Sequence, residues 1–100
     1  MALENADIIG AAGSVGTNGT AVWAAGAVSA RTGAGVYTLT LDAAADAADC
    51  SILITPRTTA QIGCYVVHTS DTVKTVHALL VAVATDTAFD FAVIRKPAGY

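Results

Sequence analysis

The sequence carries little charge for its length. Charged residues make up 13% of its 100 residues, whereas globular domains usually contain about 25%. The five Lys and Arg residues are scattered, with only Arg95 and Lys96 adjacent, and the formal net charge is −3, so no basic stripe is present that could follow a phosphate backbone. We therefore expect no nucleic acid among the partners of this protein.

Long apolar segments are also missing. The apolar run at 78–84 has 7 residues, and a membrane-spanning helix needs about 20. The first five residues include Glu4 but no Lys or Arg, so they lack the charged start of a secretory signal. We expect a protein that is made in the cytoplasm and used without a membrane step.

Cysteine is scarce, with Cys50 and Cys64 in β-branched surroundings as the whole complement. Free cysteines are among the most buried residues, and disulfides are rare in proteins that are not exported, so we predict two reduced core thiols. Zinc needs four ligands at suitable spacing. Two cysteines with His68 and His77 do not supply them, and we predict no metal and no other cofactor.

Small apolar residues dominate the composition of the chain. Hydrophobic residues make up 54% of the chain, and 22 residues are alanine, which excludes intrinsic disorder. A chain of this length fits one domain, but its own core is too small to hide so much apolar surface. We therefore expect a homo-oligomer that buries part of this surface between copies.

The apolar residues alternate with polar ones in short runs separated by Gly, Thr, Asp and Asn. This pattern predicts an all-β fold, namely a single-domain antiparallel β-sandwich or flattened barrel of seven to eight short strands. We assign an N-terminal arm to residues 1–6, the sandwich to 7–96 and a C-terminal tail to 97–100. The predicted strands cover residues 7–12, 21–25, 27–31, 36–41, 51–55, 62–69, 73–84 and 89–95.

Turn residues and strand alternation add detail to this prediction. Asn18-Gly19 favours a hairpin with a type I′ turn, in which both residues have positive φ. Alternation along 36–41 places its odd-numbered residues, which are all apolar, on the inner face, and Phe89 and Phe91 also share one face. The segment 42–49 has high helix propensity but is too short for an independent helix, so we predict a connecting loop with one helical turn.

Candidate catalytic groups do not form a convergent site in this sequence. His68, Ser70 and Asp71 include all three residue types of a hydrolase triad, but neighbours at one strand end cannot converge as a triad must. The acidic residues of loop 42–49 lack the alternating spacing, the glycine and the distant glutamate of a calcium loop. Gly33 and Gly35 are followed by neither a phosphate-binding Lys-Ser/Thr pair nor a helix. We predict that the protein is not an enzyme.

Three segments resemble sequences found in surface proteins of tailed bacteriophages. Residues 27–41 contain R-T-G-A-G-V-Y-T-L-T, which resembles the hairpin R-T-G-x-G-x-Y-T of tail-fibre domains, head fibres and capsid decoration (cement) proteins. Residues 52–56 are similar to a strand that ends in V-T-P in these families, and residues 89–95 are similar to their last strand, F-x-F-x-V-x-R. The resemblance extends over residues 21–96.

This resemblance implies a virion-surface β-domain that is usually trimeric and carries no catalytic residues. A tail fibre needs repeats, a stalk or a receptor tip, whereas a decoration protein needs one compact domain and a segment that grips the capsid. The expected function is therefore capsid decoration on the outside of a bacteriophage head, stabilising the shell through contacts with the major capsid protein. The alternative is a tail-fibre or head-fibre domain that binds a host receptor or carbohydrate.

The two ends of the chain are the expected gripping segments. Terminal residues are usually disordered unless something holds them, so we predict that these ends make intermolecular contacts. The predicted assembly contacts are Met1, Ala2, Leu3, Glu4, Asn5, Pro97 and Tyr100.

Overall fold

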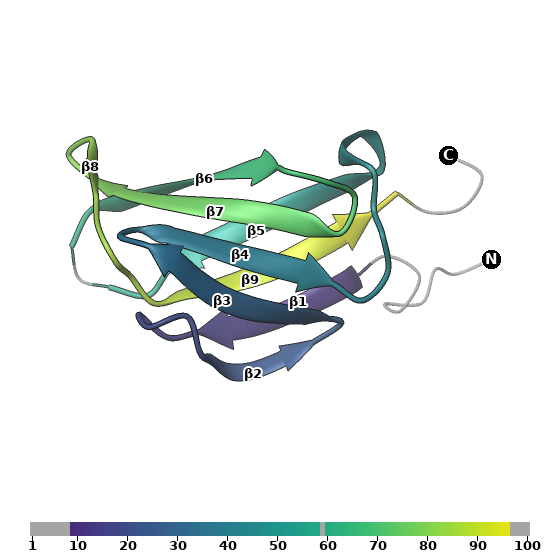
Figure 1. Ribbon diagram of the computed structural model, residues 1–100, viewed down its shortest axis with the longest axis horizontal. Helices are drawn as coiled ribbons and strands as arrows, with labels where there is room; N and C mark the ends of the chain where they lie inside the picture. The colour runs from purple at the N-terminus through teal and green to yellow at the C-terminus, as the bar shows by residue number, and fades with distance from the viewer. Residues whose placement is uncertain (1–8, 59, 97–100) are drawn as a thin grey trace.

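The chain folds into two antiparallel β-sheets packed face to face, as a computed structural model that describes residues 9–58 and 60–96 shows (Figure 1). The first sheet has the strand order β2-β1-β9-β5, and the second has the order β3-β4-β7-β6, with β8 paired to β7. The all-β sandwich prediction is confirmed. The strands are β1 (Ile9–Val15), β2 (Ala21–Ala25), β3 (Ala27–Gly33), β4 (Val36–Leu41), β5 (Cys50–Pro56), β6 (Ile62–His68), β7 (Val73–Leu80), β8 (Val83–Ala84) and β9 (Phe89–Arg95).

The core lies between the two sheets and is formed by every second residue of the central strands. Tyr37 and Leu39 are fully buried and Leu41 nearly so, as the alternation along β4 predicts. Phe89 and Phe91 enter the core together from β9, where the Phe89 ring meets the Tyr37 ring edge-on at 5.2 Å between centroids. Such aromatic edge contacts stabilise a core beyond the area that they bury.

The sandwich is open along two sides. The edge strands β2 and β5 of the first sheet lie opposite the edge strands β3 and β6 of the second sheet and do not pair with them. Gly26 alone connects β2 of the first sheet to β3 of the second, and its φ of +79° makes the sharp corner. A Cβ atom at this position would lie 2.6 Å from the Gly10 carbonyl oxygen, so only glycine fits. On the opposite side, β5 faces β6.

The predicted strand 73–84 is interrupted, which raises the number of strands within the described residues to nine. The chain reverses at Val81 and Ala82, whose φ angles are +49° and +65°, and β8 then returns along β7 with Val83 opposite Leu80. Two positive φ angles in a two-residue loop define a type I′ hairpin. A run of β-branched and small apolar residues gives no sign of this reversal, so the sequence prediction of one long strand was wrong.

The turn at Asn18-Gly19 also differs from its prediction. Gly19 has a φ of +87°, but Asn18 does not have a positive φ, so the turn is not type I′. The Gly19 amide instead donates to the Gly16 carbonyl oxygen at 2.9 Å, and the strand β1 extends to Val15, beyond its predicted end. Gly19 packs against β3 so closely that a Cβ atom would lie 2.3 Å from the Arg31 nitrogen, so glycine is required there. The turn differs from type I′ because Val15 pairs with Ala21, which leaves five residues between the strands, whereas a type I′ turn closes a two-residue loop.

The connecting loop between β4 and β5 follows its prediction. It contains one short 3-10 helix, η1 (Ala47–Asp49), whose first turn is capped by the Asp46 side chain accepting from the Ala48 amide at 3.2 Å. The predicted terminal arm, the tail and the seven predicted assembly contacts lie outside the described residues.

Candidate functional site

A hydrogen-bonded cluster lies at the end of the sandwich where the β3–β4 hairpin meets the segment entering β9. The Asp86 carboxylate accepts from the Arg31 Nε at 3.0 Å on each oxygen and from the Gly35 amide at 2.7 Å. The hydrogen bond from Arg31 is the main reason that the pKa of Asp86 lies below its usual value, and the same contact raises the pKa of Arg31. The cluster joins residues 51 or more positions apart.

Tyr37 extends this cluster into the core. Its hydroxyl donates to the Thr17 carbonyl oxygen at 2.7 Å and accepts from the Thr87 amide at 3.1 Å. One side chain thus holds the β1–β2 turn and the start of β9 to the second sheet. The Arg31 Nε, the Gly35 amide and the Tyr37 hydroxyl of the R-T-G-x-G-x-Y segment therefore serve the fold here, because each is hydrogen-bonded to a protein partner.

Two cations hold the β4–β5 loop at the other end of the molecule. Lys74 is fully buried, and its Nζ donates to the Ala45 carbonyl oxygen at 2.7 Å and to the Ser70 carbonyl oxygen at 2.9 Å. Arg95 donates to two further carbonyls of the loop, those of Ala43 at 2.6 Å and Ala44 at 3.3 Å. Backbone carbonyls therefore replace water around the buried Lys74 ammonium, which is the condition for burying a charge.

The residues considered for a hydrolase triad lie in and beside the β6–β7 turn. The Ser70 hydroxyl accepts from the Val73 amide at 3.0 Å, and the Thr69 and Thr75 hydroxyls are 2.6 Å apart. These are hydrogen bonds that shape a polar turn. Across residues 9–58 and 60–96, no group of three or more His, Cys, Asp or Glu side chains has the arrangement of a metal site.

Both cysteines are free thiols on the inner faces of edge strands. Cys50 lies on β5 and Cys64 on β6, and each is half-buried against the core. Burial raises the pKa of the Cys64 thiol, so little of it is thiolate at neutral pH. A thiol in this state is a weak nucleophile.

Exposed apolar side chains are the most prominent feature of the surface. They occur on both sheets and at the tip of the β7–β8 hairpin. Large hydrophobic residues with at least 42% exposure are Ile9, Val22, Trp23, Val28, Leu53, Tyr65, Val67, Val81 and Val83.

The outer face of the second sheet is uncharged over all four of its long strands. Pairing across the strands aligns Ala30, Thr38, Thr75 and Val67 in one row of this face. The face consists of Val28, Ala30, Val36, Thr38, Thr40, Gly63, Tyr65, Val67, Val73, Thr75, His77 and Leu79. We refer to these residues as the uncharged face.

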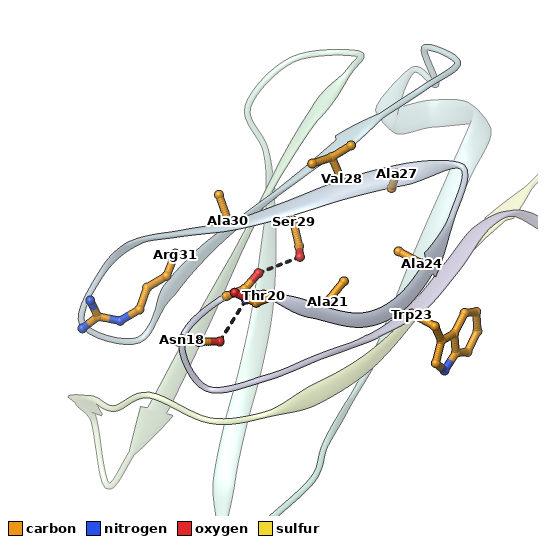
Figure 2. A pocket seen from close by; sticks show the side chains of 11 residues that line it. Asn18, Thr20, Ala21, Trp23, Ala24, Ala27, Val28, Ser29, Ala30 and Arg31 are labelled. Carbon is orange, nitrogen blue, oxygen red and sulfur yellow. Dashed lines mark hydrogen bonds between the residues drawn. The ribbon is translucent and has the colours of Figure 1, made fainter.

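The exposed tryptophan and tyrosine rings of the described residues lie on different faces. Tyr65 stacks on His77 in the uncharged face, with 4.6 Å between ring centroids and 7° between planes. Trp23 pairs with Ser14 on the outer side of the first sheet, and Figure 2 shows its side chain pointing away from β3. The outer side of the first sheet is also charged, since Arg57 donates to Ser14 at 2.7 Å and lies 3.9 Å from Asp90.

Grooves follow both open sides of the sandwich. The groove between β2 and β3, of about 560 Å³, is partly polar, and Ser29 within it donates to the Gly19 carbonyl oxygen at 2.7 Å (Figure 2). The groove between β5 and β6, of about 630 Å³, is lined by Ile52, Leu53, Ile54, Thr55, Cys64, Tyr65, Val66 and His68. We call the latter the β5–β6 groove; several core residues are only half-covered along it.

In comparisons with known proteins, no family model, curated protein or solved structure matches this chain. Within the described ranges, no helix has the length and apolar character needed to cross a membrane.

Sequence reasoning missed three features of these sites. The burial of Lys74 could have been inferred from alternation, since it stands two positions before the core residue Val76 on the same strand. The pairing of Arg31 with Asp86 has no local signal, because 55 positions separate the two residues. The exposed hairpin tip at Val81 was missed because residues 73–84 have the sequence pattern of one continuous strand.

Proposed function

We propose that this protein is a structural component of a bacteriophage virion, a capsid decoration protein on the outside of the head. One observation carries the proposal: a small sandwich exposes a wide uncharged face together with large apolar side chains on several strands. Monomeric proteins rarely expose apolar patches of more than a few hundred Å², so such surface is best explained by a protein that works within an assembly.

The proposed role is mechanical rather than catalytic. The Arg31–Asp86 pair and the buried Lys74 are engaged within the fold, which supports a structural use of these charged side chains. The proposed partners are further copies of the chain, as a trimer, and the major capsid protein, whose shell the protein stabilises. We propose neither a cofactor nor a nucleic-acid or membrane partner.

A fibre domain that binds a host receptor or carbohydrate is the competing function. Exposed aromatic rings gathered on one face would favour it, because sugars stack on such rings. Trp23 and Tyr65 instead lie on the outer sides of different sheets, an arrangement that supports decoration over glycan binding.

Electron microscopy of phage particles made with and without this chain tests the proposal. We expect density for many ordered copies over the head exterior, present only when the chain is made, and heads that withstand heat less well without it. A few copies confined to the tail would support the fibre function, and particles with no density for the chain would exclude both.

A further inference from the structure

The tip of the β7–β8 hairpin combines backbone strain with exposed apolar side chains. Val81 has a φ of +49° and Ala82 a φ of +65°, a pair of conformations that strongly favours Asn-Gly. For a β-branched residue such as Val81, positive φ is a true outlier. Despite this strain, the Val81 side chain gains nothing from burial within its own chain, because it is 88% exposed.

The position of the tip also suits a contact with another molecule. It projects from the sandwich at the end opposite to the β4–β5 loop (Figure 1). Val83, the residue that follows the turn, is 65% exposed, so the tip presents two valines close together in the sequence and no charge from residue 79 to 84. Strain held at an exposed site points from the outlier to a function.

We infer that the hairpin tip is an anchor that inserts into the β5–β6 groove of a second copy of this chain. The inference rests on the self-association in the proposed function and specifies its contact. Both sides are uncharged where they would meet, so two copies with the same net charge of −3 can approach there without repulsion. The half-buried Ile52, Ile54 and Val66 would be covered by the inserted valines.

The available area explains why a second contact is needed besides the uncharged face. Four strands about 4.8 Å apart and seven residues at about 3.3 Å each give that face a projected area of roughly 440 Å². A specific interface buries roughly 800 Å² on each partner. Strand β6 borders both the uncharged face and the β5–β6 groove through Tyr65 and Cys64, so the two surfaces form one continuous contact region.

A tip that enters a groove elsewhere on the next copy makes a heterologous contact. Contacts of this type close into rings when the rotation between copies permits. In a closed ring of three copies, each copy inserts its tip into one neighbour and receives the tip of the other, so that no groove or tip remains unoccupied. This arrangement agrees with the proposed trimer.

The first test replaces the strained pair with the preferred one, as Val81→Asn with Ala82→Gly. Measured at concentrations too low for association, relief of strain should raise Tm by about 4 °C or more, while at higher concentration loss of the anchor weakens association at least tenfold in sedimentation equilibrium. The matched control is Val22→Asn, which removes another valine that is 74% exposed but lies on β2, and it should leave association unchanged. An Asn-Gly variant that associates like the wild type would overturn the inference.

The second test does not depend on the stability of that variant. With Cys50→Ser, a Val81→Cys chain retains Cys64 in the groove as its second thiol. Mild oxidation with copper phenanthroline and air should join the thiol introduced at the tip of one copy to Cys64 of another, identified by mass spectrometry of the linked peptides. Val22→Cys in the same background should give no link to Cys64, and a Val81→Cys chain that gives none contradicts the inference.

The two tests separate this inference from the proposed self-association. An oligomer that persists in the Asn-Gly variant, together with no link from the introduced tip thiol to Cys64, leaves self-association standing and removes the tip as its anchor. A wild-type chain that stays monomeric at all concentrations overturns both.

Discussion

Replacing Tyr37 with Phe tests whether the R-T-G-x-G-x-Y segment serves the fold. The ring is fully buried against Phe89, and Phe keeps that packing, so the substitution removes only the hydroxyl. Two hydrogen bonds are then lost, one to the Thr17 carbonyl and one from the Thr87 amide.

The expected loss follows from the surroundings of these two partners. Thr87 is 2% exposed, so its amide stays buried without an acceptor, which costs about 1–3 kcal/mol. Thr17 is exposed and its carbonyl can bind water, so that bond contributes about 1 kcal/mol. We therefore expect Tyr37→Phe to lower the free energy of unfolding by about 2–4 kcal/mol.

Urea denaturation followed by far-ultraviolet circular dichroism measures this change. The matched control is Tyr65→Phe, because Tyr65 is 50% exposed and its hydroxyl makes no hydrogen bond within residues 9–58 and 60–96. That variant should stay within about 0.5 kcal/mol of the wild type. A Tyr37→Phe chain as stable as the Tyr65→Phe chain would refute the structural role of the hydroxyl.

Three further predictions follow from individual contacts. Because the pKa of Asp86 is lowered in the folded chain, its ionised form stabilises the fold at neutral pH, and this contribution is lost as the pH falls below about 4. The Tm difference between wild type and Asp86→Asn should therefore shrink from pH 7 to pH 3, and a constant difference would contradict the assignment. Gly35→Ala should cost about 1–3 kcal/mol or more, since φ is +65° and a Cβ atom would lie 2.6 Å from backbone atoms. Gly63→Ala, with nothing within 4 Å, should be neutral or stabilising, and equal losses in the two variants would exclude the clash. Since burial raises the pKa of Cys64, this thiol should react with iodoacetamide at pH 8 more slowly than glutathione does, and an equal or faster rate would show that it is not shielded.

The sequence predicted the parts of the fold that depend on local alternation. In β4 the residues at odd positions are apolar and enter the core, and in β9 Phe89 and Phe91 do the same. Period-two patterning is a local property that a single sequence displays directly. The loop 42–49 was also predictable, because a helix-forming run of this length is too short for an independent helix.

The features that escaped prediction depend on distant contacts or on strain. The turn at Asn18 has a different geometry because Val15 pairs with Ala21, so that five residues rather than two connect β1 to β2. The break at Val81 contradicts its own strand propensity, and only the folded chain reveals it. Such conflicts between local preference and structure are expected at functional sites, which supports the hairpin tip as the anchor.

The uncharged face and its neighbouring contacts show why function was harder to infer than fold. Alternation identifies residues such as Thr38 and Thr75 as outward-facing, but the row that they share with Val67 arises from the pairing of β4, β7 and β6. The order in which strands pair in a sheet cannot be inferred from the sequence of any single strand. The proposed assembly surface therefore became visible only when the register was known.

Sedimentation equilibrium of the purified chain tests the central claim most directly, namely that its uncharged surfaces are made for assembly. The account predicts association at micromolar concentration into trimers of three 10.0 kDa chains, and little dissociation when salt is raised, because screening weakens only charged contacts. A single 10.0 kDa species across the whole concentration range would contradict the account.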